Sequence, residues 1–260
     1  MKPKVVILAG GFGTRLAEET DRIPKPMVAI GSRPILWHIM KIYTQHGLND
    51  FIICAGYKAN VIIEYFANYR LHNSNLNIDL AKGTVTCLKE PRETWKVNII
   101  DTGERAETGG RLLRIRDYLN PSEPFCMTYG DGVSNVNVAE VIQFHKNQGH
   151  EATLVAVRPP SRFGTVDILN GRVESFSEKP MSGESYINGG FFVLEPSVLD
   201  LIEGDHTVWE RGPLEALTKK GKLGAYIHEG FWHPMDTLRD HRYLEQLWLS
   251  NKAPWKTWED

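Results

Sequence analysis

Two hydrophobic periods alternate along the first half of the chain. Short runs rich in Val, Ile and Leu have the length of buried strands. We expect such strands at 4–9, 51–55, 78–80, 97–101, 124–129 and 152–157. Between them, apolar side chains recur every three or four residues, which predicts helices over 34–46, 61–69, 111–119 and 138–148. Strands that alternate with helices predict an α/β fold with a mostly parallel central sheet and helices on both faces.

The pattern changes after Pro159 and Pro160 and becomes more typical of antiparallel strands. The dipeptide Asn170-Gly171 separates two alternating segments, 164–169 and 171–176, which predicts a β-hairpin. Further strands are expected at 191–194 and 225–228, and helices over 196–202, 213–220 and 237–249. Because no linker or repeat divides the chain, we expect a single domain over 1–260, with halves at 1–158 and 159–260.

Composition and charge exclude several classes of protein. The chain has 260 residues, of which 42% are hydrophobic, so it can bury a core. The 30 basic and 32 acidic residues give a net charge of −2, which argues against a nucleic-acid partner. The apolar runs are far shorter than the roughly 20 residues that cross a bilayer, so we expect no membrane segment and a cytoplasmic protein. The three cysteines and the scattered histidines have neither disulfide nor zinc spacing, and we expect buried thiols.

A glycine-rich turn follows the first expected strand. Gly10, Gly11 and Gly13 leave backbone amides open to a phosphate or a base. The turn is not a dinucleotide fingerprint, because Leu16 stands where that motif has its third glycine. It is not a Walker-type phosphate loop either, because no Gly-Lys-Ser or Gly-Lys-Thr follows. The turn alone leaves open a tight strand-to-helix connection without a ligand.

A lysine held between two prolines comes shortly after this turn, in the segment Pro24-Lys25-Pro26. Prolines fix the backbone, so a lysine between them loses less entropy when it binds a phosphate. Taken alone, the segment favours a rigid exposed turn that binds nothing.

Together, the turn at 8–16 and the segment 24–27 resemble the paired motif of the sugar nucleotidylyltransferases, which join a nucleoside triphosphate to a sugar 1-phosphate. The resemblance covers the whole chain and implies the Rossmann-like nucleotide-diphospho-sugar transferase fold. It also implies a nucleotide-binding first half and a second half for sugar-phosphate binding and oligomerisation. Its further carriers are 108–112, 129–132, 163–164, 178–180, 187–192, 235–240 and 253–259.

The resemblance implies that the sugar phosphate attacks the α-phosphorus of the triphosphate and that pyrophosphate leaves. Two anions must therefore meet, and at about 4 Å and an effective dielectric near 20 they repel by about 4 kcal/mol. Because the attacking oxygen is already ionised, positioning and charge neutralisation should carry the catalysis. The resemblance assigns Mg²⁺ to Asp131 and Asp236, in accord with the preference of this ion for oxygen ligands. A helix cap remains the alternative for Asp236, which Thr237 follows.

The resemblance also assigns the other site residues. Arg15 and Lys25 would hold the triphosphate, and Lys179 would hold the sugar phosphate from the opposite side. The expected catalytic set is Arg15, Lys25, Asp131, Lys179 and Asp236. The expected nucleotide-binding residues are Leu8, Ala9, Gly10, Gly11, Phe12, Gly13, Thr14, Arg15, Lys25, Thr108, Arg111 and Gly130. The expected sugar-phosphate-binding residues are Tyr129, Gly164, Glu178, Lys179, Asn188, Gly189 and Gly190.

The segment 101–111 is longer than its counterpart in the thymidylyl and uridylyl members, and we expect it to border the base. Arg111 can donate to a phosphate or to the cytosine carbonyl, and the Thr108 hydroxyl can complete the base edge. The closest resemblance is to the branch that uses CTP and glucose 1-phosphate, which we expect as the substrates. Another nucleotide or another sugar phosphate, such as a heptose phosphate, remains open. A nucleotide sensor without activity is the other alternative, and it would be expected to have lost the lysine or an aspartate of the motif.

Aromatic residues leave two further questions open. Tyr129 either flanks the sugar or packs in the core, because it ends an expected strand. The tryptophans of the polar C-terminal region, Trp232, Trp248, Trp255 and Trp258, must pack on something. We expect them to contact a neighbouring subunit, and hence a homo-oligomer.

Overall fold

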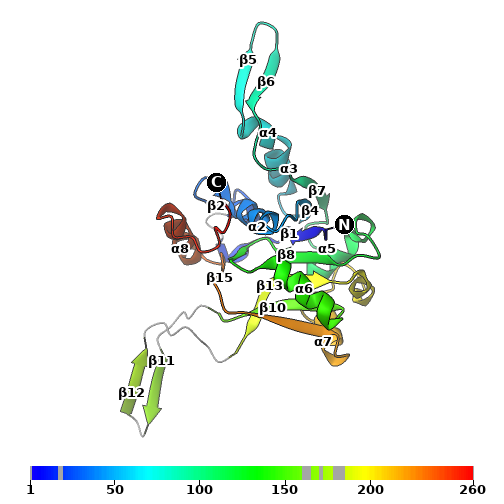
Figure 1. Cartoon of the computed structure of the whole chain (residues 1–260), viewed down its shortest axis with the longest axis vertical. Coiled ribbons are helices and arrows are strands. Elements are labelled where there is room, and N and C mark those ends of the chain that lie inside the picture. The colour runs from blue at the N-terminus through cyan, green and yellow to red at the C-terminus, as the bar shows by residue number, and fades with distance from the viewer. Residues whose placement is uncertain (1, 17–19, 160–164, 170–171, 178–184, 260) are drawn as a thin grey trace.

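The computed structural model describes residues 2–16, 20–159, 165–169, 172–177 and 185–259. Their centre is a seven-stranded sheet that takes strands from both halves of the chain (Figure 1). All its strands run in the same direction except β13, which is antiparallel to both neighbours. The expected mostly parallel sheet is confirmed. Its spatial order is β14 (Leu223–His228), β10 (Ala152–Val157), β13 (Ile187–Leu194), β8 (Phe125–Tyr129), β1 (Val5–Leu8), β4 (Asp50–Ala55) and β7 (Lys96–Asp101).

The central strands are apolar throughout because helices cover both faces of the sheet. In β1, Val5 and Ile7 belong to one hydrophobic cluster, whereas Val6 and Leu8 belong to the other. The first cluster also contains α2, and the second contains residues of α5 and α7. A strand buried on both faces reads as an unbroken apolar run, which is why the sequence located it. The helices are α2 (Ile35–Thr44), α3 (Ala59–Ala67), α4 (Tyr69–His72), α5 (Thr108–Arg114), α6 (Val138–Gln148), α7 (Gly212–Lys219) and α8 (Leu238–Leu249).

Two expected helices differ from the structure. The segment at 196–202 forms a 3-10 helix, η4 (Pro196–Leu201), and the segment at 111–119 is divided between α5 and η3 (Arg116–Tyr118). Helix α5 begins earlier than expected because a distant loop satisfies its first amides. The N–H groups of Gly109 and Gly110 both donate to the carbonyl of Thr207. No local pattern could reveal that contact.

Among the described residues, four strand pairs lie outside the central sheet. β11 (Thr165–Leu169) and β12 (Arg172–Ser177) pair antiparallel, which confirms the expected hairpin, although its turn at 170–171 lies outside the described residues. β2 (Ala29–Ile30) pairs with β3 (Arg33–Pro34), and β9 (Gly132–Ser134) pairs with β15 (Trp232–Pro234). The fourth pair is β5 (Asn75–Asp79) with β6 (Thr84–Lys89). We call this fourth pair the β5–β6 arm.

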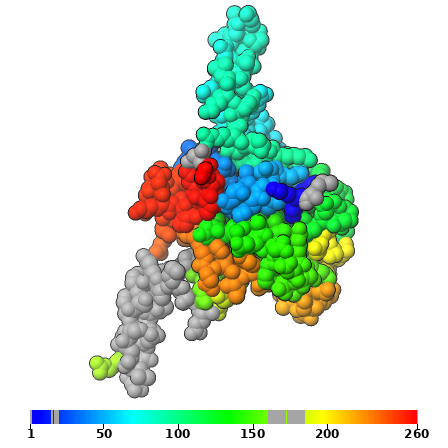
Figure 2. All heavy atoms as spheres, in the orientation of Figure 1, coloured from blue at the N-terminus to red at the C-terminus, as the bar shows by residue number. Residues whose placement is uncertain are grey.

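The β5–β6 arm stands clear of the body beyond α3 and α4 (Figures 1 and 2). The sequence predicted a strand only at 78–80 and missed β6 entirely. The reason is that neither face of the arm packs against the hydrophobic core of the chain. Leu80 is 90% exposed and Leu88 is 66% exposed, so hydrophobic alternation does not mark an inner face.

The C-terminal tryptophan Trp255 packs within the chain, and the contact expected from the C-terminal tryptophans with another subunit remains a prediction. Trp255 is fully buried and stacks on Phe231 and Trp248. Its indole N–H donates to Nδ1 of His38 at 3.4 Å, and Nε2 of His38 bonds to the carbonyl of Ile30 at 2.9 Å. These partners fit a neutral imidazole that carries its proton on Nε2. Burial lowers the pKa of His38 to about 4.

Other expectations concern thiols, membranes and domain number. Cys54 and Cys126 are buried free thiols, as expected, and burial raises the pKa of each to about 12. Cys87 differs from the expectation, since it lies on β6 of the arm and is only partly buried. Among the described residues, no helix has the length and apolar character that crossing a bilayer requires. The single domain over 1–260 remains a prediction, favoured by a central sheet whose strands come from 1–158 and from 159–260.

Candidate active site

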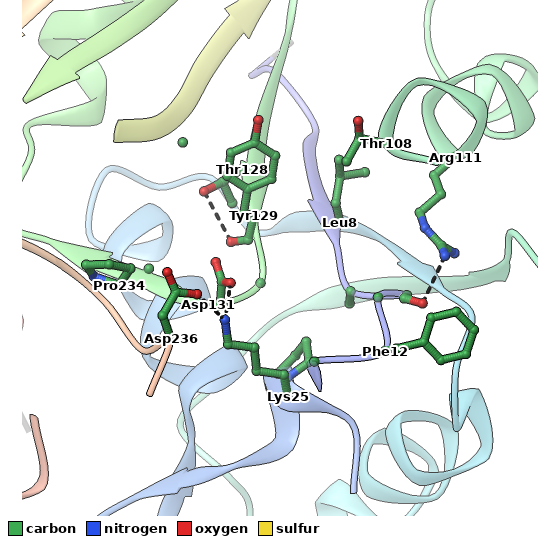
Figure 3. Close-up of a pocket in the computed structure, with 18 of the residues that line it drawn as sticks. Leu8, Phe12, Lys25, Thr108, Arg111, Thr128, Tyr129, Asp131, Pro234 and Asp236 are labelled. Carbon is green, nitrogen blue, oxygen red and sulfur yellow. Dashed lines mark hydrogen bonds and ion pairs between the residues drawn. The ribbon is translucent and has the colours of Figure 1, made fainter. Parts of the chain in front are cut away.

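A pocket of about 630 Å³ opens at the carboxyl ends of β1 and β8 (Figure 3). From β1 the chain proceeds to β4 and β7 on one side, and it later returns to place β8 on the other side. The strand order therefore reverses between β1 and β8, which is where open α/β sheets bind ligands. β13 adds to the same edge because it runs antiparallel, so that its first residues lie beside the end of β8. The volume is typical of a small-molecule site.

The glycine-rich turn forms one wall of this pocket. Gly13 has a φ of +66°, a conformation that favours glycine, and a Cβ there would lie 2.9 Å from the Thr20 side chain. At Gly10 a Cβ would collide with the guanidinium of Arg111. The local structure therefore explains why glycine stands at these two positions. The backbone of the turn, including Gly11 and Thr14, lines the pocket.

Lys25 is buried and lines the pocket, so the alternative of an exposed turn at Pro24-Lys25-Pro26 is wrong. It begins the 3-10 helix η2 (Lys25–Met27) and is only 7% exposed. Its ammonium lies 2.7 Å from Asp131 Oδ2 and 2.6 Å from Asp236 Oδ1 (Figure 3). Burial lowers the pKa of Lys25, but the two carboxylates outweigh this effect, and the pKa is raised overall. The side chain is therefore a cation fixed between two anions.

A short antiparallel pair brings the two carboxylates together although they are far apart in the sequence. Asp131 immediately precedes β9, and Asp236 follows β15 by two residues. In this ladder Gly132 pairs with Pro234, and the N–H of Met235 donates to the carbonyl of Asp131 at 2.8 Å. The two aspartates therefore lie at the same end of the pair.

The first turn of α8 settles the other interpretation of Asp236. The N-cap of this helix is Thr237, whose hydroxyl accepts from the N–H of Asp240. Asp240 in turn accepts from the N–H of Thr237, which completes a capping box. Asp236 is therefore not the cap, and its carboxylate contacts Lys25.

The Asp131 and Asp236 pair fits magnesium by donor type. Both groups supply hard oxygen atoms, and Mg²⁺ commonly takes only one or two carboxylates, with phosphate and water as its other ligands. Among the described residues, no cluster of three or more His, Cys, Asp and Glu side chains could hold a metal by itself. The site therefore suits an ion that arrives together with phosphates.

The charge of the pocket wall favours the same interpretation. Among the described lining residues, the acidic side chains outnumber the basic ones. The described wall therefore carries no surplus of positive charge. The basic members are Lys25, Arg105 and Arg111, and the acidic members are Glu104, Glu107, Asp131 and Asp236.

Arg111 lines the pocket, but its terminal nitrogens are engaged by the protein. Nη1 donates to Thr102 Oγ1 and to the carbonyl of Gly103, each at 2.8 Å. Nη2 donates to the carbonyl of Gly10 at 2.9 Å and to that of Glu104 at 3.2 Å. These acceptors follow β1 and β7, so the guanidinium joins the loops that leave two strands of the sheet. Both terminal nitrogens of Arg111 are therefore already bonded to the protein, and they are not open donors for the expected contact with the base or a phosphate.

Tyr129 and Thr108 face the pocket from β8 and α5. The Tyr129 hydroxyl donates to Glu210 Oε1, and the Thr108 hydroxyl donates to Glu210 Oε2 at 2.7 Å. Burial raises the pKa of Tyr129, and the charge of Glu210 adds to the effect, so the phenol stays protonated. Asn188 Nδ2 lies 3.5 Å from the Tyr129 hydroxyl. Tyr129 is thus part of a polar network at the pocket and not only a core aromatic.

Most of the expected site residues meet in this one pocket. The expected residues that line it are Leu8, Ala9, Gly10, Gly11, Phe12, Gly13, Thr14, Lys25, Thr108, Arg111, Tyr129, Gly130, Asp131, Asn188, Gly189, Gly190 and Asp236. The backbone of Arg15 belongs to η1 (Thr14–Leu16), and its side chain is outside the described part of the structure. Gly164, Glu178 and Lys179 also lie outside the described residues.

Sequence reasoning missed two residues that shape the pocket. Trp232 lines it and donates its indole N–H to the carbonyl of Gly189 at 2.6 Å, which ties β15 to the start of β13. Glu210 holds Tyr129 and Thr108 from behind the wall. The surplus of tryptophans was visible in the sequence but pointed to a subunit contact. No sequence signal marked Glu210, because its place depends on how the loop before α7 packs against α5.

Comparison with known proteins decides the family. The family model described as "Nucleotidyl transferase" matches residues 4–238. The chain belongs to the nucleotidyl transferase family. This nucleotidyl transferase is 56% identical over 256 residues to proteins named "Glucose-1-phosphate cytidylyltransferase" from Salmonella typhimurium and Salmonella typhi. The match covers 98% of this chain and 100% of each relative.

A solved structure supports the fold of this nucleotidyl transferase. The crystal structure of HddC from Yersinia pseudotuberculosis superposes with a TM-score of 0.70 and 24% sequence identity. The superposition covers 95% of this chain and 100% of that one. The expected sheet architecture is therefore shared with a protein of low sequence identity.

Proposed function

We propose that this nucleotidyl transferase moves the cytidylyl group of CTP to α-D-glucose 1-phosphate. An oxygen of the sugar phosphate forms a bond to the α-phosphorus, and the bond from that phosphorus to the β-phosphate oxygen breaks. Pyrophosphate leaves with the electron pair, and CDP-glucose is the other product. The observation that carries the proposal is the convergence of Lys25, Asp131 and Asp236 at the switch point of the sheet. The full-length match to the Salmonella enzymes supports the choice of substrates.

Charge neutralisation is the main task of the site. The attacking oxygen is ionised at neutral pH, so the reaction needs no base to activate it. Asp131 and Asp236 would hold a divalent cation, which we propose to be Mg²⁺, and the ion supplies positive charge to the phosphates when bound. Lys25 supplies a fixed positive charge beside the same position. We propose that Arg15 contacts the triphosphate, since it follows the glycine-rich turn directly.

The sugar phosphate is proposed to lie on the side of the pocket formed by β8 and β13. Asn188 can donate to a sugar hydroxyl, and Tyr129 flanks the same space. A Cβ on Gly190 would lie 2.6 Å from the Tyr129 ring, so only glycine leaves that ring its place. Lys179 is proposed to hold the phosphate of the sugar. The other proposed contacts on this side are Gly164, Glu178 and Gly189.

The base is proposed to lie against the segment 101–111 and the glycine-rich turn. Thr108 and Arg111 are already hydrogen-bonded to the protein, so we assign them to shaping this wall. Backbone groups of the turn are then left to contact the base and ribose. Because few side chains are open to read the base, another nucleotide of the same class remains the second candidate. A heptose phosphate is the corresponding candidate for the sugar.

A pyrophosphate-release assay with a substrate panel tests the proposal. The four nucleoside triphosphates are each combined with glucose 1-phosphate, and CTP is combined with other hexose and heptose 1-phosphates. We expect the highest kcat/KM for CTP with glucose 1-phosphate and no release without Mg²⁺. A higher kcat/KM for another pair would transfer the function to that pair. No release with any pair would support the sensor alternative.

We also propose that the chain forms a homo-oligomer through the β5–β6 arm. An isolated two-stranded hairpin is marginally stable in water, and this arm exposes Ile78, Leu80, Val85 and Leu88. A second copy of the chain would cover these side chains. Light scattering at micromolar concentration should give more than one subunit, and Leu80→Asp with Leu88→Asp should give the monomer. A monomer for the unchanged protein would contradict the proposal.

A further inference from the structure

Glu210 contacts two sides of the pocket without lining it. It lies in the loop before α7 and is half-buried. One carboxylate oxygen accepts from the hydroxyl of Tyr129 at the end of β8, and the other accepts from the hydroxyl of Thr108 at the start of α5. In Figure 3 these two hydroxyls point the same way, away from Lys25, Asp131 and Asp236. Glu210 therefore connects the end of β8 with the start of α5, away from Lys25, Asp131 and Asp236.

The carboxylate fixes the direction of every hydrogen bond in this bridge. An ionised carboxylate can only accept, so both hydroxyl groups must turn their protons toward it. The Thr108 oxygen then accepts from the N–H of Trp209 at 2.9 Å. The Tyr129 oxygen keeps its remaining acceptor capacity for Asn188 Nδ2 and for a ligand hydroxyl. A neutral amide in place of Glu210 has only one accepting atom and could not orient both hydroxyls in this way.

No cation competes for this carboxylate in the described part of the chain, where Glu210 has no basic side chain within 4 Å. Its two hydroxyl partners are therefore its main polar contacts there. Hydrogen bonds to a charged group are about twice as strong as neutral ones. The two bonds to Glu210 can therefore hold the Tyr129 and Thr108 side chains in place. The ring of Tyr129 is held on its other side by Gly190, where a Cβ would leave only 2.6 Å. Tyr129 is thus fixed at both its hydroxyl and its ring.

We propose that Glu210 is a positioning residue that holds the nucleotide wall and the sugar wall of the pocket in register, through Thr108 on one and Tyr129 on the other. The assignment of the two walls rests on the proposed function. Glu210 touches neither the cation site nor the reacting phosphates, so its loss should weaken the binding of both substrates more than it slows the chemical step. A residue that acts on one wall only would affect one substrate.

Steady-state kinetics of Glu210→Gln, with CTP and glucose 1-phosphate varied in turn, test this inference. We expect the KM of each substrate to rise about tenfold and kcat to change less than about threefold. Tyr129→Phe should raise mainly the KM of glucose 1-phosphate, and Thr108→Val mainly that of CTP. Glu215→Gln, an exposed change on α7, is the matched control and should leave all constants unchanged. Unchanged KM values for Glu210→Gln would overturn the proposal, as would a loss confined to kcat.

A second measurement does not depend on the substrates. Urea unfolding of Glu210→Gln, Tyr129→Phe and the double variant measures the coupling between the two side chains. We expect the double variant to lose clearly less stability than the two single losses together, because the same hydrogen bond is removed twice. Strict additivity would contradict the network. An inactive natural chain that retains this coupling would overturn the proposed function and leave the positioning contact intact.

Discussion

Lys25 contacts the two carboxylates proposed to hold the metal ion and competes with the ion for their oxygens, so removing it should affect metal binding and turnover in opposite directions. Asp131 and Asp236 each contact the ammonium, at 2.7 and 2.6 Å. A metal that takes one of these two contacting oxygens competes with the ammonium for it. A hydrogen bond to a charged group contributes about 1.5 kcal/mol or more, which corresponds to roughly a tenfold change in affinity.

The remaining carboxylates add to this effect once the lysine is gone. Their contacting oxygens are at most 5.3 Å apart, the sum of the two distances to the ammonium. Two unit charges at that separation and an effective dielectric of about 20 repel by about 3 kcal/mol. Solvent screens part of this, since the Asp131 side chain is 30% exposed. A bound divalent ion relieves what remains, so Lys25→Met should bind metal at least about tenfold more tightly.

The assay is a titration with Mn²⁺ in place of magnesium, followed by the electron paramagnetic resonance of the free ion and without nucleotide. Lys25→Met should have a Kd for Mn²⁺ at least about tenfold below that of the natural chain. Its turnover of CTP and glucose 1-phosphate should fall at least about 10²-fold, because a charge contact to the phosphates is lost. Lys146→Met, an exposed change on α6, should alter neither value. Unchanged or weaker Mn²⁺ binding in folded Lys25→Met would refute the reasoning, since misfolding alone weakens both properties.

Three further changes test other parts of the structure. Asp131→Asn should reduce turnover at least about 10²-fold in the pyrophosphate assay, and near-normal turnover would remove this carboxylate from the site. His38 has a folded pKa of about 4 against 6.5 unfolded, so its contribution to the free energy of unfolding falls by about 2 kcal/mol from pH 7 to pH 5, where the unfolded state binds the proton. His38→Gln should remove that part of the slope in urea titrations, and an unchanged slope would contradict it. Trp255→Ala should cost about 3–5 kcal/mol of unfolding free energy, and a loss below about 1 kcal/mol would show that the tail does not stabilise the body.

The sequence predicted the sheet well, because its strands and helices depend on local patterns. Val5–Leu8 is buried on both faces and therefore reads as an unbroken apolar run. The prolines on both sides of Lys25 predicted that its backbone is held in one conformation. No local pattern could predict that Asp131 and Asp236 lie close together, because the pairing of β9 with β15 determines this.

The features that the sequence did not predict depend on contacts between distant segments. Arg111 appeared to be a free donor fork, yet it is satisfied by carbonyls that come together only when the loops after β1 and β7 fold around it. Trp255 lies in a polar tail that offers it no local packing partner, and its partners come from α2 and α8. Strand β6 lacks a buried face in this chain, so its hydrophobic pattern carries no signal. In each case the residue type was informative, but its partner could not be inferred from neighbouring positions.

One labelling experiment tests the central claim most directly. Glucose 1-phosphate that carries ¹⁸O in its three terminal phosphate oxygens is incubated with CTP, Mg²⁺ and the enzyme, and both products are analysed by mass spectrometry. Attack by the sugar phosphate on the α-phosphorus predicts CDP-glucose that retains all three labelled atoms and unlabelled pyrophosphate in equal amount. Labelled pyrophosphate, or CTP consumed without CDP-glucose, would contradict the account.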